Sequence, residues 1–205
     1  MMQALNYLKE SPSQTAGPYV HIGLAPGAAG FHLFDRELGQ VIAPEGVPGT
    51  RIRIDGVVID ATGEPLKDVL LEVWQADANG IYPHAEDPQQ AACAPGFRGW
   101  GRIITDFDSG LWSLESIKPG SVPMRFGPPQ APHISFWLVA RGINIGLNTR
   151  MYFPEDAALQ AADPVLASIE QRDRVATLVA TAVGPDHYRF DIRLQGAGET
   201  VFIDV

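Results

Sequence analysis

Cysteine is nearly absent from this 205-residue sequence, in which Cys93 is the only one. A single cysteine forms no internal disulfide, which excludes the disulfide frameworks of small secreted domains and is compatible with a reducing compartment. The N-terminal residues lack a basic segment followed by an apolar stretch of signal-peptide length, and membrane-length apolar runs are missing from the sequence. We therefore expect a soluble, unexported protein of the cytoplasm that does not enter a membrane.

Positive charge is also scarce. The chain has 15 Lys and Arg residues against 24 Asp and Glu residues, which gives a net charge of -9 and a pI of about 4.9. A chain with this charge balance lacks the basic surface that would neutralise the phosphates of a nucleic acid or a membrane. Nucleic acids and anionic membranes are therefore not expected as partners.

Hydrophobic residues are plentiful and arranged in short runs. They make up 45% of the chain, enough for one packed core, and β-rich chains of this length commonly fold as one domain. The runs end at Gly, Pro, Asp or Asn, as strands of antiparallel sandwiches do. Expected strands cover residues 51–59, 69–74, 101–105, 111–114, 133–140, 149–153, 188–194 and 200–205. We predict an all-β, antiparallel β-sandwich in which the first two strands are neighbours.

Two regions depart from this pattern. Near residues 155–180, apolar residues recur at helical spacings among Ala, Glu, Gln and Arg, which predicts a short helical excursion that Pro164 interrupts or restarts. Residues 17–49 are rich in glycine and proline, which predicts an irregular N-terminal arm that lies on another surface, such as a partner chain. We assign residues 1–50 to this arm and long connection, and residues 51–205 to the sandwich, as parts of a single domain.

The residues taken alone identify no active site. His133 and Ser135 project from the same face of an expected strand, but this pair does not chelate a metal as two histidines would. A lone strand histidine, or a tyrosine after a turn such as Tyr82, more often serves packing. No nucleophile elbow accompanies Ser135, which argues against a hydrolase, and no phosphate-binding glycine loop is visible.

Five ordered segments carry a resemblance to a known family. They read SPSQTAGPYVHIGL at 11–24, LEVWQADANGIY at 71–82, GRIITDFDSGLWSLESIKPG at 101–120, APHISFWLVARGINIGLNTRMYF at 131–153 and YRFDIRLQGAGETVFIDV at 188–205. Their order and spacing resemble the intradiol aromatic-ring dioxygenases, non-haem Fe(III) enzymes that hold iron with two tyrosines and two histidines. The resemblance extends over nearly the whole chain.

The resemblance places Tyr82, Val122, His133 and Ser135 at the four iron-ligand positions. Valine offers no donor atom and serine is a poor ligand, so the resemblance implies a degenerate iron site and no metal bound by this chain. The chain resembles the iron-free member of enzymes built from two homologous chains, in which the partner beta chain holds Fe(III). This chain alone is therefore expected to carry no catalytic residue and to be inactive.

The same resemblance implies a role at the substrate pocket of the complex. The two chains together would cleave 3,4-dihydroxybenzoate with O2 between its hydroxyl-bearing carbons, giving 3-carboxy-cis,cis-muconate. The substrate carboxylate needs a cation, and Arg141 in the ARGINI segment matches the arginine that reaches the pocket in the family. Thr15, Gly17 and Pro18 of the SQTAGPY turn are expected to form part of its wall. The expected partners are the homologous beta chain and a carboxylated catechol, in a higher-order (αβ)n oligomer.

Two other functions remain open at this point. A self-sufficient intradiol dioxygenase acting on catechol or hydroxyquinol would need a complete ligand set, which Val122 and Ser135 do not supply. A non-catalytic β-sandwich module would hold a ligand or partner in an exposed groove. Arg141 and the N-terminal turn favour the two-chain dioxygenase over such a module.

Overall fold

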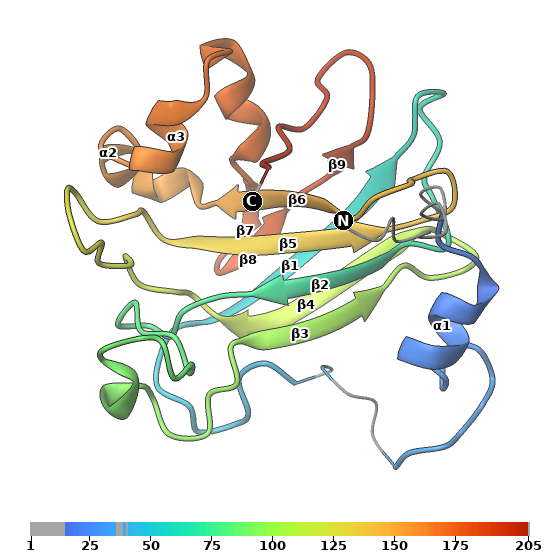
Figure 1. Ribbon diagram of the computed structural model, residues 1–205, viewed down its shortest axis with the longest axis horizontal. Coiled ribbons are helices and arrows are strands. Elements are labelled where there is room, and N and C mark those ends of the chain that lie inside the picture. The colour runs from blue at the N-terminus through green and yellow to red at the C-terminus, as the bar shows by residue number, and fades with distance from the viewer. Residues whose placement is uncertain (1–14, 36–38, 40, 205) are drawn as a thin grey trace, which may run out of the picture.

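Two β-sheets packed face to face form the centre of the molecule (Figure 1). The computed structural model describes residues 15–35, 39 and 41–204. One sheet has the strand order β4-β1-β8-β7 with β9 beside β1, and the other has the order β3-β2-β5-β6. The strands are β1 (Arg51–Ile59), β2 (Leu70–Trp74), β3 (Trp100–Ile104), β4 (Leu111–Ile117), β5 (His133–Val139), β6 (Leu147–Tyr152), β7 (Thr181–Gly184), β8 (His187–Arg189) and β9 (Ile192–Arg193).

The core lies between the sheets because successive strand residues point to opposite faces. In β5, Ile134 and Phe136 are buried on the inner face, whereas Ser135 is half-buried on the outer face. Trp112 of β4 meets Phe136 across the core, with ring centroids 5.6 Å apart. The outer face of the second sheet is therefore available to carry a functional site.

The predicted β-sandwich is confirmed, with strand pairings that differ in part from the expectation. The second sheet and the β1–β4 and β7–β8 pairs are antiparallel, but β1 runs parallel to β8 and β9. The prediction that the first two strands are neighbours was wrong, since β1 and β2 belong to different sheets. A bridge between Ile59 and Pro65 closes the turn after β1, and the chain then crosses to the second sheet. The same turn sequence can lead into a hairpin or into a crossover to another sheet, so the local sequence pattern did not distinguish these two connections.

The predicted helical excursion is confirmed as a series of short pieces, which Figure 1 shows beside the end of β6. They are η2 (Pro154–Asp156), α2 (Ala157–Gln160), α3 (Pro164–Ser168) and η3 (Arg172–Leu178). Pro164 starts α3, where its missing N–H has no helical partner to lose. The carboxylate of Asp163 caps this helix by accepting hydrogen bonds from the backbone N–H groups of Val165 and Leu166.

The N-terminal arm is less irregular than predicted. The helix α1 (Pro18–Leu24) begins directly after Gly17, and η1 (Gln90–Ala92) adds a short turn later in the chain. Proline favours the first position of a helix, a signal that the glycine content of the arm obscured. Ser11–Gln14, which open the first resembling segment, lie outside the described residues.

The C-terminal strand predicted at 200–205 is absent from the described residues 200–204. Thr200 instead exchanges hydrogen bonds with Arg193, and residue 205 lies outside the described residues. Within the ranges that the structure describes, no helix has the length and apolar character required to cross a bilayer.

Candidate functional site

The two ends of β5 carry the two groups of residues that the sequence singled out. His133 opens the strand, and Arg141 follows two positions after its last residue, Val139. At about 3.3 Å per residue, the strand separates these ends by roughly 20 Å. The iron-ligand positions and the expected substrate residues therefore form two separate sites.

The loop that carries Tyr82 is held close to the segment that carries Val122. The buried carboxylate of Asp77 accepts hydrogen bonds from three backbone N–H groups of this region, at 2.8, 3.1 and 2.8 Å. Gly80 has φ +80°, and a Cβ atom there would lie 1.9 Å from the carbonyl oxygen of Ser121. Only glycine allows this close approach of the two backbones, which brings Tyr82 beside Val122.

A hydrogen bond joins Tyr82 and His133, the two retained ligand positions. Tyr82 Oη lies 3.4 Å from His133 Nε2, and His133 Nδ1 lies 2.8 Å from the carbonyl oxygen of Ala131. Since a carbonyl only accepts, Nδ1 carries the ring proton and Nε2 accepts from the Tyr82 hydroxyl. Burial, and then the positive charge of Arg150, lower the pKa of His133 to about 4, while burial raises the pKa of Tyr82. Both side chains are neutral at pH 7, and the hydroxyl proton of Tyr82 lies between Tyr82 Oη and His133 Nε2.

The other two positions add no useful ligand. Val122 presents only carbon, and Ser135 presents a neutral hydroxyl. Arg150 of β6 pairs with Ser135 across the sheet, and its guanidinium donates a hydrogen bond to Gln130 Oε1 at 2.5 Å. In the described part of the chain, no cluster of three His, Cys, Asp or Glu side chains suits a metal ion. Two neutral donors beside a fixed positive charge do not fit a ferric ion, which favours anionic ligands.

The buried neutral state of His133 makes stability depend on pH. A histidine in the unfolded chain takes up a proton near pH 6.5, whereas His133 in the folded chain does so only near its lowered pKa of about 4. The unfolded chain therefore binds more protons in this window, and the free energy of unfolding should fall as the pH is lowered from about 6.5 to about 4. Chemical denaturation at several pH values measures this slope.

A His133→Asn variant is the matched test of that slope, because asparagine retains a donor for the Ala131 carbonyl but does not titrate. We expect the pH dependence to become shallower in this variant and to stay unchanged in His32→Gln, which alters an exposed histidine. An equally steep slope in His133→Asn would assign the effect to other groups.

A cleft of about 870 Å³ opens beside the Tyr82–His133 pair. Trp74 and Tyr82 line it and stack with ring centroids 5.5 Å apart and planes 10° apart. Val122 and Met124 add apolar surface to the same cleft. Two of the four iron-ligand positions, Tyr82 and Val122, therefore line this cleft. A third, His133, is hydrogen-bonded to Tyr82, and Ser135 lies two residues farther along β5.

A second cleft, of about 360 Å³, lies at the other end of β5. Gly17, Pro18 and Arg141 line it, so the structure brings together three of the four expected substrate residues. Thr15 is not among the lining residues, but its hydroxyl hydrogen-bonds backbone atoms on both sides of Arg141, at 3.2 and 2.7 Å. Thr15 therefore ties the N-terminal turn to the end of the strand.

Charged and polar groups meet in this second cleft. The Nε of Arg141 donates to Asp68 Oδ2, and the side chain of Arg141 is 74% exposed. His21 also lines the cleft and was not predicted from the sequence. Its Nε2 is buried without a hydrogen-bond partner among the described residues, and burial lowers its pKa while Asp68 opposes the shift. The available signal was its place in the GPYVHIGL segment that follows Thr15.

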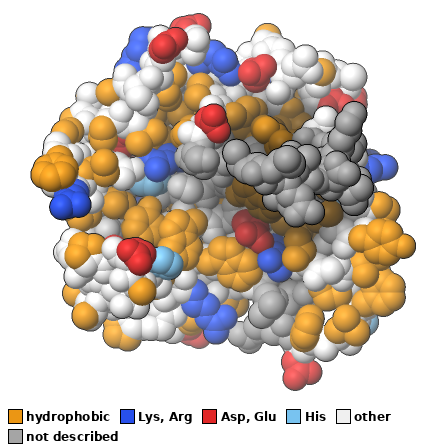
Figure 2. Space-filling model, viewed as in Figure 1, with side chains coloured by type: hydrophobic (Ala, Val, Ile, Leu, Met, Phe, Trp, Pro, Cys, Tyr) orange, Lys and Arg blue, Asp and Glu red, His pale blue; other side chains and the backbone are white. Residues whose placement is uncertain are grey.

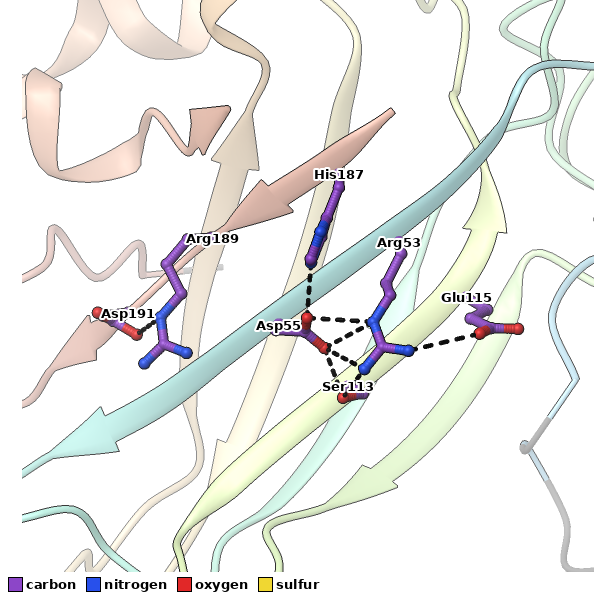
Figure 3. Close-up of polar contacts among 7 residues, drawn as sticks. All are labelled: Arg53, Asp55, Ser113, Glu115, His187, Arg189 and Asp191. Carbon is purple, nitrogen blue, oxygen red and sulfur yellow. Dashed lines mark hydrogen bonds and ion pairs between the residues drawn. The ribbon is translucent and has the colours of Figure 1, made fainter. Parts of the chain in front are cut away.

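The outer face of the first sheet carries a charged network instead of a catalytic site (Figure 3). Asp55 accepts hydrogen bonds from Arg53, Ser113 and His187, at 3.1, 2.5 and 2.6 Å. Burial would raise the pKa of Asp55, but these hydrogen bonds outweigh it and lower the pKa to about 2. A serine hydrolase needs histidine between serine and aspartate, whereas here the aspartate lies between the other two. This network gives no support to a hydrolase.

Comparisons with known proteins identify relatives of the chain. A family model described as Dioxygenase matches residues 34–196. The chain is 50% identical over 203 residues to the protocatechuate 3,4-dioxygenase alpha chain of Pseudomonas putida, covering 98% of each. It is 37% identical over 186 residues to the protocatechuate 3,4-dioxygenase beta chain of Burkholderia cepacia, covering 85% of this chain and 77% of that one. Among solved structures, the dioxygenase domain of a carbohydrate-binding fusion from Streptomyces sp. SirexAA-E matches with a TM-score of 0.52 and 26% identity, over 78% of this chain and 86% of that one.

Proposed function

This chain belongs to the intradiol dioxygenase family, and from that membership we propose that it is the iron-free subunit of a two-chain oxidoreductase that opens the ring of 3,4-dihydroxybenzoate. Its relatives include both an alpha chain and a beta chain of protocatechuate 3,4-dioxygenase. The observation that carries the proposal is the hydrogen bond between Tyr82 and His133, which joins the two retained ligand positions without a metal. Arg141 faces a separate cleft. The hydrogen bond between Tyr82 and His133 and the positive charge of nearby Arg150 both disfavour a ferric ion here, which argues against a self-sufficient dioxygenase.

Under this proposal Fe(III) belongs to the homologous beta chain, and no catalytic step uses a ligand from this chain. When bound there, Fe(III) would supply the activation of the catechol toward O2, and no residue of this chain would hold it. The ring opens between the two hydroxyl-bearing carbons, and both oxygen atoms enter the product, 3-carboxy-cis,cis-muconate.

The part of this chain is to bind the substrate carboxylate. A carboxylate removed from water needs a cation or several donors, and the guanidinium of Arg141 supplies both. Asp68 holds its Nε, which leaves the outer N–H groups for the ligand. Gly17 and Pro18 keep the opposing wall thin, and Thr15 holds that wall against the strand end.

The beta chain should dock beside this cleft. Large hydrophobic side chains of the arm are exposed there, including Tyr19 at 83%, Leu33 at 67% and Phe34 at 58%. Figure 2 shows hydrophobic side chains gathered at the lower right of the molecule, where Figure 1 places α1. Contiguous exposed apolar surface of this kind marks protein interfaces. We assign this face to contact with the beta chain in an (αβ)n oligomer of the cytoplasm. Residues 1–50 and 51–205 would act as one domain in this assembly.

Measuring iron in each chain of the co-expressed, separated complex tests the proposal. We expect the iron and the red tyrosinate-to-ferric colour to accompany the beta chain, and this chain to be colourless. Tyr82→Phe in this chain should leave the iron content of the complex unchanged, because Tyr82 binds no metal. Stoichiometric iron in the isolated chain, or iron lost through Tyr82→Phe, would contradict the proposal.

A further inference from the structure

A buried histidine in the cleft around Arg141 has no hydrogen-bond partner for one of its ring nitrogens. His21 is only 9% exposed, and its Nε2 is buried without a partner in the part of the chain that the structure describes. A buried polar atom without a partner lowers stability, so its presence in a native protein calls for an explanation. A ligand that enters the cleft and binds Nε2 is one such explanation.

The helix α1 places the ring of His21 at the cleft wall. Pro18 and His21 both line the cleft, and residues three positions apart lie on the same face of a helix. The backbone carbonyl of His21 accepts a hydrogen bond from the N–H of Ala25 at 2.8 Å, which holds this helical turn. The ring of His21 meets that of Phe107 edge-on, with centroids 5.4 Å apart. The position of His21 is therefore set by local structure in this chain.

Arg141 by itself is a weakened site for a carboxylate. Asp68 lines the same cleft, and its Oδ2 accepts a hydrogen bond from Arg141 Nε. The negative charge of Asp68 offsets part of the attraction that Arg141 exerts on an anion. A carboxylate accepts hydrogen bonds at both of its oxygens. A neutral donor in the same cleft would therefore strengthen binding of the carboxylate without changing the charge balance.

His21 is the residue of this cleft that can supply such a donor. Burial lowers the pKa of His21, so its ring is neutral at pH 7 and carries one N–H group. Apart from His21, Asp68 and Arg141, the described residues that line the cleft have apolar side chains or are glycine. The torsion that turns a histidine ring varies over a broad range, which allows the buried Nε2 to turn toward an entering ligand.

We propose that His21 is a specificity-determining residue, whose Nε2–H donates a hydrogen bond to the substrate carboxylate beside Arg141. This inference rests on the proposed function, because it needs the carboxylate of the substrate in this cleft. A carboxylated ring supplies the partner that Nε2 lacks in the free chain. A catechol without the carboxylate leaves Nε2 without a partner, so His21 favours the carboxylated substrate.

Oxygen uptake by the assembled two-chain enzyme, with 3,4-dihydroxybenzoate and with catechol, tests this role. His21→Phe keeps an aromatic ring against Phe107 but removes the donor, and we expect kcat/KM for 3,4-dihydroxybenzoate to fall about tenfold. Its kcat/KM for catechol should stay close to that of the wild type. His21→Gln keeps a side-chain N–H donor and should restore part of the lost activity.

Two further measurements separate substrate binding from a structural role. His84→Phe makes the same change at an exposed histidine of the other cleft and should alter the turnover of neither substrate. Chemical denaturation of the isolated chain should find His21→Phe no less stable than the wild type, since the variant removes a buried nitrogen without a partner.

The outcomes distinguish this inference from the proposed function. Unchanged kcat/KM for 3,4-dihydroxybenzoate in His21→Phe would overturn the role of His21, and so would an equal loss with both substrates. A loss in Arg141→Ala with none in His21→Phe would refute the role of His21 alone. No loss in either variant would contradict the substrate cleft itself, and with it the proposed function.

Discussion

Arg141→Ala is expected to lower kcat/KM of the assembled enzyme for 3,4-dihydroxybenzoate by about 10- to 100-fold, because a hydrogen bond to a charged group contributes about 1.5–3 kcal/mol. Arg141 stands in the cleft that Gly17 and Pro18 also line, and only its Nε is engaged within the described residues. Removing the guanidinium leaves the substrate carboxylate without its cation. Oxygen uptake at a series of substrate concentrations measures the change.

The matched control for Arg141→Ala is a change in the substrate. Catechol lacks the carboxylate, so its turnover by the variant should stay close to that by the wild type, and the preference for the carboxylated substrate should narrow. Asp68→Asn should have a smaller effect, because it only loosens the Arg141 side chain. If both substrates lost activity equally, Arg141 would have a structural role in the interface and no role in substrate binding.

Asp163→Ala is expected to lower the free energy of unfolding by about 3–5 kcal/mol, since it leaves two buried backbone N–H groups and one partly buried group without an acceptor. Asp163 is fully buried. Its Oδ1 accepts from Val165 and Leu166 at 2.8 and 2.9 Å, and its Oδ2 accepts from Ala131 at 2.7 Å. The carbonyl oxygen of the same Ala131 accepts a hydrogen bond from His133 Nδ1, so the variant should also disturb the Tyr82–His133 pair. Chemical denaturation gives the loss.

Two variants show whether burial is the cause of that loss. Asp163→Asn keeps one acceptor oxygen for the helix cap and should have a smaller effect than alanine. Asp106 likewise accepts three local hydrogen bonds, but it lies exposed in a turn where water replaces them. Asp106→Ala should therefore change stability far less, and equal losses at Asp106 and Asp163 would show that hydrogen-bond number matters and burial does not.

Local sequence patterns were sufficient for most strands and for the helical excursion. The run RIRIDGVVI predicted β1 with the bounds that the structure has, Arg51–Ile59, because apolar alternation stops there at Asp60. Pro164 marked the restart of a helix because proline fits only the first turn. By contrast, β7 (Thr181–Gly184) is exposed along its length and so has no apolar pattern to recognise.

The pairing of strands that are distant in the chain could not be predicted from the sequence pattern. The placement of β1 and β2 in different sheets depends on the chain path after a turn, which local residues do not encode. Arg150 was missed as part of the degenerate site because its position beside Ser135 follows from the β5–β6 register. Arg141, Gly17 and Pro18 came from the family resemblance, and the structure places them in one cleft, where their role in substrate binding stays a prediction.

The proton that joins Tyr82 to His133 also bears on biosynthesis. When a subunit needs a bound metal to complete its fold, its folding depends on the supply of that metal. Here a hydrogen bond joins the two retained ligand positions directly, without a metal ion between them. We therefore expect this chain to reach its folded state equally well with and without iron in the medium, as chemical denaturation of the chain expressed under both conditions would measure.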